Sequence, residues 1–219
     1  MKTFHEFISD AAMELGGVNL LFEQGMYQLM DDLSRIVTVL RDAMISFEVI
    51  GGIAVNAHVA FVGRSIGTRD IDILIQRQDL EKVVSSAESA GYSGRKIFGG
   101  FMLIRPGQKP EDAVHLLFSG ERPRSANPLP NPSLHPEEIH LFNFDITIPV
   151  ARLQELVQMK LNVFRPKDEV HLELLDKCGL ISEAIESSLP TILKERLVQA
   201  RSRFSIDDFE EVEDDPYPT

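Results

Sequence analysis

The chain has 219 residues, 43% of them hydrophobic, and its formal net charge at pH 7 is −12. This length accommodates one large domain or a domain with a helical extension, and the hydrophobic content is sufficient for a real core. The negative charge repels a phosphate backbone and argues against extended binding to DNA or RNA.

Two features predict a cytoplasmic protein without a membrane segment. The chain starts with MKTFHEFISD, which lacks the apolar centre of a signal peptide, and no apolar run reaches the ~20 residues that span a bilayer. The single cysteine, Cys178, excludes an intrachain disulfide and fits a reducing compartment. We expect Cys178 to be a packed thiol, because no base stands beside it.

The first 46 residues are expected to form a helical segment that packs on the core. Apolar residues recur at helical spacing within residues 1–24, and Gly16-Gly17 is expected to end this short helix. A longer helix is expected from about Met26 to Ile45, where the same spacing returns.

The stretch from Phe47 to Gln76 predicts a strand, a glycine turn, a helix, a basic loop and a second strand. The first strand is Phe47–Ile50, the turn is Gly51 and Gly52, and the helix is Ala54–Val62. Glycines at a strand-to-helix turn let a phosphate approach the backbone, and the helix N-terminus adds free N–H groups. Alone, a Gly-Gly pair is equally typical of a plain tight turn.

The second strand of this stretch carries Asp70 and Asp72. Alternate side chains of a strand share a face, so the two carboxylates are expected roughly 7 Å apart along the backbone. Two neighbouring acids repel each other, and a divalent cation such as Mg²⁺ removes that repulsion. A lone Asp-x-Asp is common on exposed strands. The combination with the residues just before the acids is more specific: Arg64, Thr68 and Arg69.

The order Val-Ile-Gly-Gly-Ile-Ala, then Arg-Ser-Ile-Gly-Thr-Arg-Asp-Ile-Asp-Ile-Leu-Ile, resembles the polymerase-beta-like nucleotidyltransferase superfamily. The likeness is greatest to small bacterial members, which include the abortive-infection toxin type, and it covers roughly residues 47–181. The resemblance implies that Gly51 and Gly52 hold a nucleoside triphosphate and that Asp70 and Asp72 bind Mg²⁺. It also implies nucleotide binding by Arg64, Thr68 and Arg69.

Beyond this stretch, the sequence predicts a helix over Asp79–Ala90 that Gly91 ends. Strands are expected at Lys96–Arg105 and Ala113–Phe118, joined by a polar turn, and an irregular surface loop is expected over residues 120–136. A further strand is expected at Leu141–Ile148.

Catalytic members of the superfamily place a third carboxylate on a neighbouring strand, and here the matching residue is His115. Three interpretations stay open. His115 is a substitute base, since histidine accepts a proton near neutral pH. Alternatively, the protein binds a nucleotide without catalysis. Finally, the expected strand register is wrong and another acid, such as Asp145, fills the role.

The segment Leu153–Phe164 predicts a helix with one apolar stripe, and Lys160 lies within that stripe. Its ammonium either reaches water or a nearby acid, or it reaches nucleotide phosphates or the aspartate pair. The resemblance favours the second alternative, because small nucleotidyltransferases often carry Met-Lys-Leu followed by Arg-x-Lys-Asp. A helix is expected to start at Pro166, with Asp168 capping it and His171 packing.

The C-terminal part predicts one more basic helix over Leu189–Phe204, followed by an acidic, mobile tail over residues 207–219 that holds seven acids and no base. His135 and His140 have no common zinc-ligand spacing and are expected in an exposed loop.

Together these patterns predict an α/β fold of the α+β kind: a small mixed sheet flanked by helices, with helical extensions at both ends. The expected parts are a helical segment (1–46), a core (47–150), a helical region (151–206) and the tail. The expected function is transfer of a nucleoside monophosphate from a Mg²⁺-bound triphosphate to a hydroxyl of a protein, a small molecule or an RNA end. Asp70, Asp72 and His115 would be catalytic, while Lys160 and Arg64 would offset phosphate charge. The alternative is a nucleotide-binding or partner-binding protein without catalysis.

Overall fold

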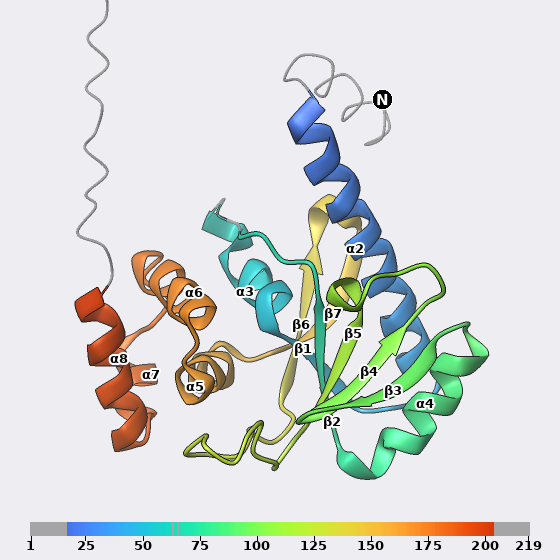
Figure 1. The fold of residues 1–219 in the computed structure, drawn as a ribbon. Helices are drawn as coiled ribbons and strands as arrows, with labels where there is room; N and C mark the ends of the chain where they lie inside the picture. Colours follow the sequence, from blue (N-terminus) through green and yellow to red (C-terminus); the bar gives the residue numbers. More distant parts are fainter. Residues whose placement is uncertain (1–16, 63, 65, 204–219) are drawn as a thin grey trace, which may run out of the picture.

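The computed structural model describes residues 17–62, 64 and 66–203. A seven-stranded mixed sheet in the order β3-β4-β5-β2-β1-β7-β6 is the centre of the fold (Figure 1). Its strands are β1 (Phe47–Ile50), β2 (Ile71–Ile75), β3 (Ser93–Ile97), β4 (Gly100–Ile104), β5 (Val114–Phe118), β6 (Pro136–Leu141) and β7 (Ile146–Ala151). β2 runs parallel to β5 and β1 parallel to β7, whereas the other neighbouring pairs are antiparallel. The predicted mixed α/β fold is therefore confirmed.

Seven α-helices surround the sheet in the described part of the chain: α2 (Gly17–Asp42), α3 (Gly51–Val59), α4 (Leu80–Ser89), α5 (Leu153–Val163), α6 (Pro166–Lys177), α7 (Glu183–Ser188) and α8 (Thr191–Arg203). In Figure 1, α2 and α4 lie together on one side of the molecule, and α5, α6 and α8 form a second group on the other. Helix α3 contacts β1 and β2 as well as α5 and α6, so it joins the sheet to the second group.

Strand β2 lies at the centre of the sheet, and its alternating side chains pack into a core on each face. Ile71, Ile73 and Ile75 are fully buried in the main core, which also contains apolar residues of α2. Asp72 and Leu74 point to the opposite face, where Leu74 packs in a smaller apolar cluster with Met159 of α5. The strand begins at Ile71, so Asp70 is the residue immediately before it.

The predicted strand Lys96–Arg105 is wrong in one respect, because the segment is a hairpin. Strands β3 and β4 pair with each other, and Ile97 and Gly100 are the partners that close the turn at Phe98-Gly99. Gly99 has a φ of +77°, a left-handed conformation that glycine adopts without the steric cost of a Cβ. This glycine breaks a run that otherwise has the composition of one strand.

The predicted strand Leu141–Ile148 is also wrong, since it crosses a turn. β6 ends at Leu141, a short 3₁₀ segment covers Phe142–Phe144, and Asp145 has a φ of +49° before β7 starts. His140 consequently lies on β6, an edge strand, and not in a loop.

Two helix predictions need correction as well. The helix expected from Met26 to Ile45 starts earlier, at Gly17, so Gly17 belongs to the helix that it was expected to precede. Helix α7 (Glu183–Ser188) was not expected; Ser182 caps it by accepting a hydrogen bond from the N–H of Ile185 at 3.4 Å. The remaining helices agree with their predicted positions to within a few residues.

The short N-terminal helix expected within residues 1–24 lies mostly outside the described residues, and the acidic tail at 207–219 lies entirely outside them. The division into four parts stays a prediction. Among the described helices, none combines the length and apolar character needed to cross a bilayer.

Candidate active site

The glycine turn and the aspartate pair meet directly. Strands β1 and β2 are antiparallel neighbours, and Ile50 stands opposite Asp72 in their register. Gly51, the next residue, has a φ of +72°, and a Cβ placed on it would lie 2.9 Å from Cγ of Asp72. A Cβ on Gly52 would lie 2.5 Å from the hydroxyl oxygen of Thr68. Only residues without a side chain fit in this corner.

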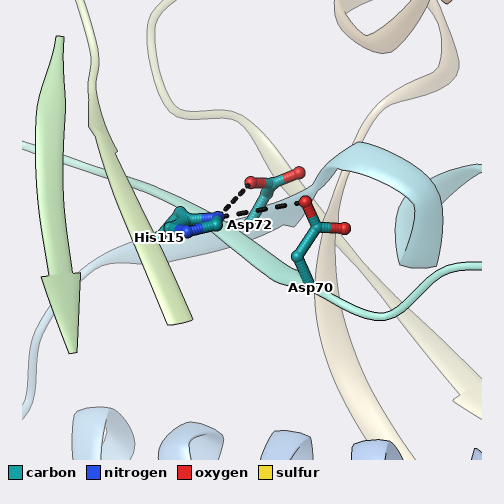
Figure 2. Close-up of side chains that lie close together, drawn as sticks. All are labelled: Asp70, Asp72 and His115. Carbon is teal, nitrogen blue, oxygen red and sulfur yellow. Dashed lines mark ion pairs between the residues drawn. The ribbon is translucent and has the colours of Figure 1, made fainter. Parts of the chain in front are cut away.

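The side chains of Asp70, Asp72 and His115 point toward one another (Figure 2). β2 and β5 are parallel, and Asp72 and His115 are partners in their register. Nδ1 of His115 lies 3.5 Å from Oδ1 of Asp72 and 3.9 Å from Oδ2 of Asp70. One ligand atom from each of the three side chains lies within 4.8 Å of the others, a geometry that one metal ion can bridge.

The charges of this cluster influence one another. Burial opposes ionisation of Asp72, but the hydrogen bond from His115 and the positive charges of His115, Lys160 and Lys167 leave its pKa lowered. The hydrogen bond to Asp72 raises the pKa of His115, against the opposing effect of burial. Thr68 donates a hydrogen bond of 3.3 Å to Oδ1 of Asp70, which fixes the second carboxylate.

The alignment of His115 with Asp72 tests whether the strand register was predicted correctly, which is one of the three interpretations of the missing third carboxylate. The register is as expected, and Asp145 lies at the turn between β6 and β7 with 97% of its side chain exposed. The interpretation in which Asp145 replaces the third carboxylate is therefore wrong. His115 itself occupies the aligned position, and its role there, in catalysis or in a protein that only binds a nucleotide, stays a prediction.

Basic side chains from α5 and α6 surround the carboxylates. Lys160 is 5% exposed, and its Nζ lies 3.5 Å from Oδ1 of Asp168. Nζ of Lys167 lies 3.7 Å from Oδ2 of Asp70. Lys160 thus pairs with a nearby acid, as the first alternative predicts, and its charge also contributes to the lowered pKa of Asp72. A contact of Lys160 with nucleotide phosphates stays a prediction.

Asp168 connects the start of α6 to this cluster. Its carboxylate accepts hydrogen bonds from the backbone N–H of Arg165 at 3.1 Å and from Nε of Arg165 at 2.8 Å. The predicted capping role is confirmed. Burial lowers the pKa of Lys160, although Asp168 opposes this shift. His171, one turn further along, is buried as expected, and burial together with Lys160 lowers its pKa to about 4.

The three-residue cluster and the basic side chains of Lys160, Arg165 and Lys167 border one cleft of about 250 Å³. Of the predicted site residues, those that border it are Gly51, Asp70, Asp72, His115 and Lys160. Arg64 and Arg69 are exposed and do not border it, and Arg69 lies 3.9 Å from Glu111. A nucleotide contact by these two arginines stays a prediction.

Several other residues also border the cleft, although no pattern in the sequence assigned them to it: Ile97, Phe98, Gly99, Gly100, Pro123, Arg124, Asn131, Arg165 and Lys167. Arg165 and Lys167 stood within the motif Arg-Pro-Lys-Asp, so their charge next to Lys160 was a usable signal. Phe98 and Arg124 carry no such signal, because only the hairpin and the loop that follows β5 bring them to the cleft.

A second buried carboxyl lies on the same face of the sheet. Glu48 of β1 is fully buried, and its Oε2 accepts a hydrogen bond of 3.0 Å from the N–H of His135. Its other oxygen has no hydrogen-bond partner among the described residues. Burial, together with the charge of Glu155, raises the pKa of Glu48 to about 7.

The donor set of the three-residue cluster fits a divalent cation. Two carboxylates supply the hard oxygen ligands that Mg²⁺ prefers, and the imidazole adds a nitrogen that suits Mn²⁺ or Zn²⁺ better than Mg²⁺. The space between the three ligand atoms is of the right size.

Comparisons with known proteins give similarity in fold only. No family model matches the sequence, and no curated protein matches it significantly. The crystal structure of ANT(2")-Ia in complex with adenylyl-2"-tobramycin is 13% identical with a TM-score of 0.47, over 80% of this chain and 98% of that one.

Two further structures are similar to a comparable degree. An antigenic nucleotidyltransferase-like protein from Paracoccidioides brasiliensis is 14% identical with a TM-score of 0.48, over 80% of this chain and 88% of that one. The lincosamide antibiotic adenylyltransferase LnuA, lincomycin-bound, is 14% identical with a TM-score of 0.39, over 84% and 98%. At such low identity the function has to be argued from the side chains of the cleft.

Proposed function

We propose that the chain is a metal-dependent nucleotidyltransferase that moves a nucleoside monophosphate from a nucleoside triphosphate to an acceptor hydroxyl. One observation carries the proposal: the Gly51–Gly52 corner touches Asp72 and Thr68, while Asp70, Asp72 and His115 form a three-ligand cluster beside it. A phosphate on the corner and a cation on the cluster would therefore be immediate neighbours.

The corner would hold the far end of the triphosphate. Helix α3 starts there and has no side-chain cap, so its first backbone N–H groups are available to an anion. Lys160, Arg165 and Lys167 border the same cleft and would offset the remaining phosphate charge. Each of the three forms an ion pair with a carboxylate of the cleft. The site therefore offers carboxylates for a metal ion and basic side chains for the phosphates next to it.

Asp70 and Asp72 would hold Mg²⁺. The metal would neutralise charge on the triphosphate and on the transition state. Thr68 orients Asp70 by its hydrogen bond, and the contact between Gly51 and Asp72 fixes the second ligand relative to the corner.

In the proposed reaction, the acceptor oxygen forms a bond to the α-phosphorus while the bond from that phosphorus to the bridging oxygen of pyrophosphate breaks. Pyrophosphate leaves, and the hydroxyl proton passes to His115. Orientation of the two substrates and electrostatic stabilisation by the basic side chains would supply most of the rate. The acceptor class and the relation to the toxin-type members stay predictions.

The proposal is tested by incubating the protein with Mg²⁺ and each labelled triphosphate in the presence of cell extract. We expect one triphosphate to give label transfer with pyrophosphate release, and expect Asp70→Asn and Asp72→Asn to abolish it. Asp145→Asn is the matched control, because this acid is exposed at the other edge of the sheet. Equal activity in the Asp72→Asn variant and the parent would overturn the proposal.

One observation favours a second candidate, a nucleotide-binding protein without catalysis. His115 already lies 3.5 Å from Asp72, so an imidazolium can satisfy this carboxylate in place of a metal. In that case the protein would bind a triphosphate, shown by a rise in its melting temperature, and would transfer label to nothing in the extract.

A further inference from the structure

The cleft has two chemically different walls, one on each side of the aspartate pair. In the sheet order, β1 with its glycine corner lies on one side of β2, and β5, β4 and β3 lie on the other. The first wall also receives the basic residues of α5 and α6. The second wall consists of the β3–β4 turn and the loop around Pro123. His115 belongs to β5 on this side of β2, and its ring faces the two aspartates (Figure 2).

Phe98 is the most unusual residue of the second wall. It lies at the tip of the β3–β4 hairpin, borders the cleft, and is 84% exposed. The tip is held in place, because a Cβ on Gly99 would lie 2.5 Å from the carbonyl oxygen of Pro123. An exposed aromatic ring on a tightly packed turn is available for stacking with a planar ligand.

Arg124 gives the same wall a positive charge. It borders the cleft and is exposed, and no hydrogen bond or ion pair to its side chain occurs within the part of the chain that the structure describes. Arg165 and Lys167 on the opposite wall differ, since each is paired with an aspartate. The guanidinium of Arg124 is therefore available to an incoming anion.

From these two residues we infer that the second wall is the acceptor subsite and that the acceptor is a free small molecule with a planar ring and a phosphate or carboxylate beside it. The inference rests on the proposed function, because it places the triphosphate on the first wall. Stacking on Phe98 would hold the ring, Arg124 would bind the anionic group, and the acceptor hydroxyl would face His115. The charge of Arg124 disfavours a polycationic acceptor at this wall, and the net charge of −12 disfavours a long polyanion.

The chain contains no tryptophan, so Phe98→Trp creates a single fluorescent reporter at the subsite. The variant is first saturated with Mg²⁺ and the non-hydrolysable nucleoside triphosphate analogue that raises its melting temperature most, which is expected to occupy the first wall. It is then titrated with adenosine 5′-monophosphate, adenosine, ribose 5-phosphate, spermine and a short single-stranded oligonucleotide. Phe142→Trp is the matched control, because Phe142 is 85% exposed at the turn on the opposite edge of the sheet.

Adenosine monophosphate is expected to quench the tryptophan of the Phe98→Trp variant and not that of the Phe142→Trp variant. Adenosine should bind about tenfold more weakly. Ribose 5-phosphate should not quench but should compete with adenosine monophosphate, and spermine should do neither. Adding Arg124→Gln should weaken adenosine monophosphate about tenfold and leave adenosine nearly unchanged.

Two failures are distinguishable. If no non-hydrolysable nucleoside triphosphate analogue with Mg²⁺ raises the melting temperature, the proposed function fails and the subsite fails with it. If the analogue binds but adenosine monophosphate does not quench, or Arg124→Gln has no effect, only the acceptor subsite is overturned. Much tighter binding of the oligonucleotide than of the mononucleotide would refute the free small molecule as acceptor.

Discussion

Replacement of Gly51 by alanine tests the geometry on which the site depends. The left-handed conformation at Gly51 costs an L-residue about 1–2 kcal/mol. In addition, the new Cβ would lie 2.9 Å from Cβ and Cγ of Asp72, and such overpacking costs about 1–3 kcal/mol. Gly51→Ala should thus lower the free energy of unfolding by about 2–5 kcal/mol and displace the carboxylate of Asp72 from the cluster.

Gly179→Ala is the matched control for this experiment. Gly179 has a φ of +69°, close to the +72° of Gly51, but a Cβ there would meet no atom within 4 Å. Urea unfolding followed by circular dichroism gives both free energies, and the rise in melting temperature with Mg²⁺ and a triphosphate reports the site. We expect Gly51→Ala to lose that rise and Gly179→Ala to keep it. Equal unfolding free energies with the rise intact in both variants would refute the close approach of corner and carboxylate.

Three further substitutions give defined expectations. The pKa of Glu48 is raised from 4.5 to about 7 in the folded protein. The free energy of unfolding is therefore unaffected by Glu48 below pH 4.5, and it falls as the pH rises from 4.5 through 7, because the folded state resists ionisation of this carboxyl. Glu48→Gln should therefore stabilise the protein by about 3 kcal/mol at pH 8 and by almost nothing at pH 4.5, measured by urea unfolding at each pH. Asp168→Asn leaves the buried ammonium of Lys160 without its anion and should cost about 3–5 kcal/mol by the same measurement. His115→Asp adds a third carboxylate, which should lower the melting temperature without Mg²⁺ and enlarge its rise with Mg²⁺, measured by thermal unfolding.

Each of these expectations has its own control. The parent and Glu48→Gln must differ in their pH dependence between 4.5 and 7, and parallel curves would contradict the raised pKa. For Asp168, adding Lys160→Met should recover much of the loss, whereas Asp176→Asn, which breaks a more exposed pair with Arg201, should cost below about 1 kcal/mol. A rise with Mg²⁺ that is smaller in His115→Asp than in the parent would refute metal binding at this position.

The sequence was sufficient to predict that the glycine corner and Asp72 lie close together, because strand alternation and turn chemistry act over a few neighbouring residues. Strand alternation places Asp72 opposite the isoleucine face, and the glycine pair marks the strand-to-helix corner. The position of His115 beside Asp72 was predicted from the resemblance to the nucleotidyltransferase superfamily, and the register of β2 and β5 agrees with it.

Sequence reasoning failed where long-range contacts decide. The run around Phe98 has the composition of one strand apart from Gly99-Gly100, a local turn signal that the strand prediction passed over, and the pairing of Ile97 with Gly100 closes the hairpin there. The approach of Arg124 to the cleft depends on the loop after β5, for which no periodic pattern exists. The partner of Lys160 was ambiguous for a related reason, since helices α5 and α6 must pack before Asp168 can reach it.

Asp168 links the cleft to the first turn of helix α6, because it contacts both Lys160 and the backbone of Arg165. One carboxylate closes the first turn of α6 through Arg165 and also holds Lys160 in the cleft. A phosphate that attracts Lys160 would compete with Asp168, so occupancy of the cleft would be transmitted to the backbone at the start of this helix. Amide hydrogen exchange in the first turn of α6 would then report ligand binding without any label on the ligand.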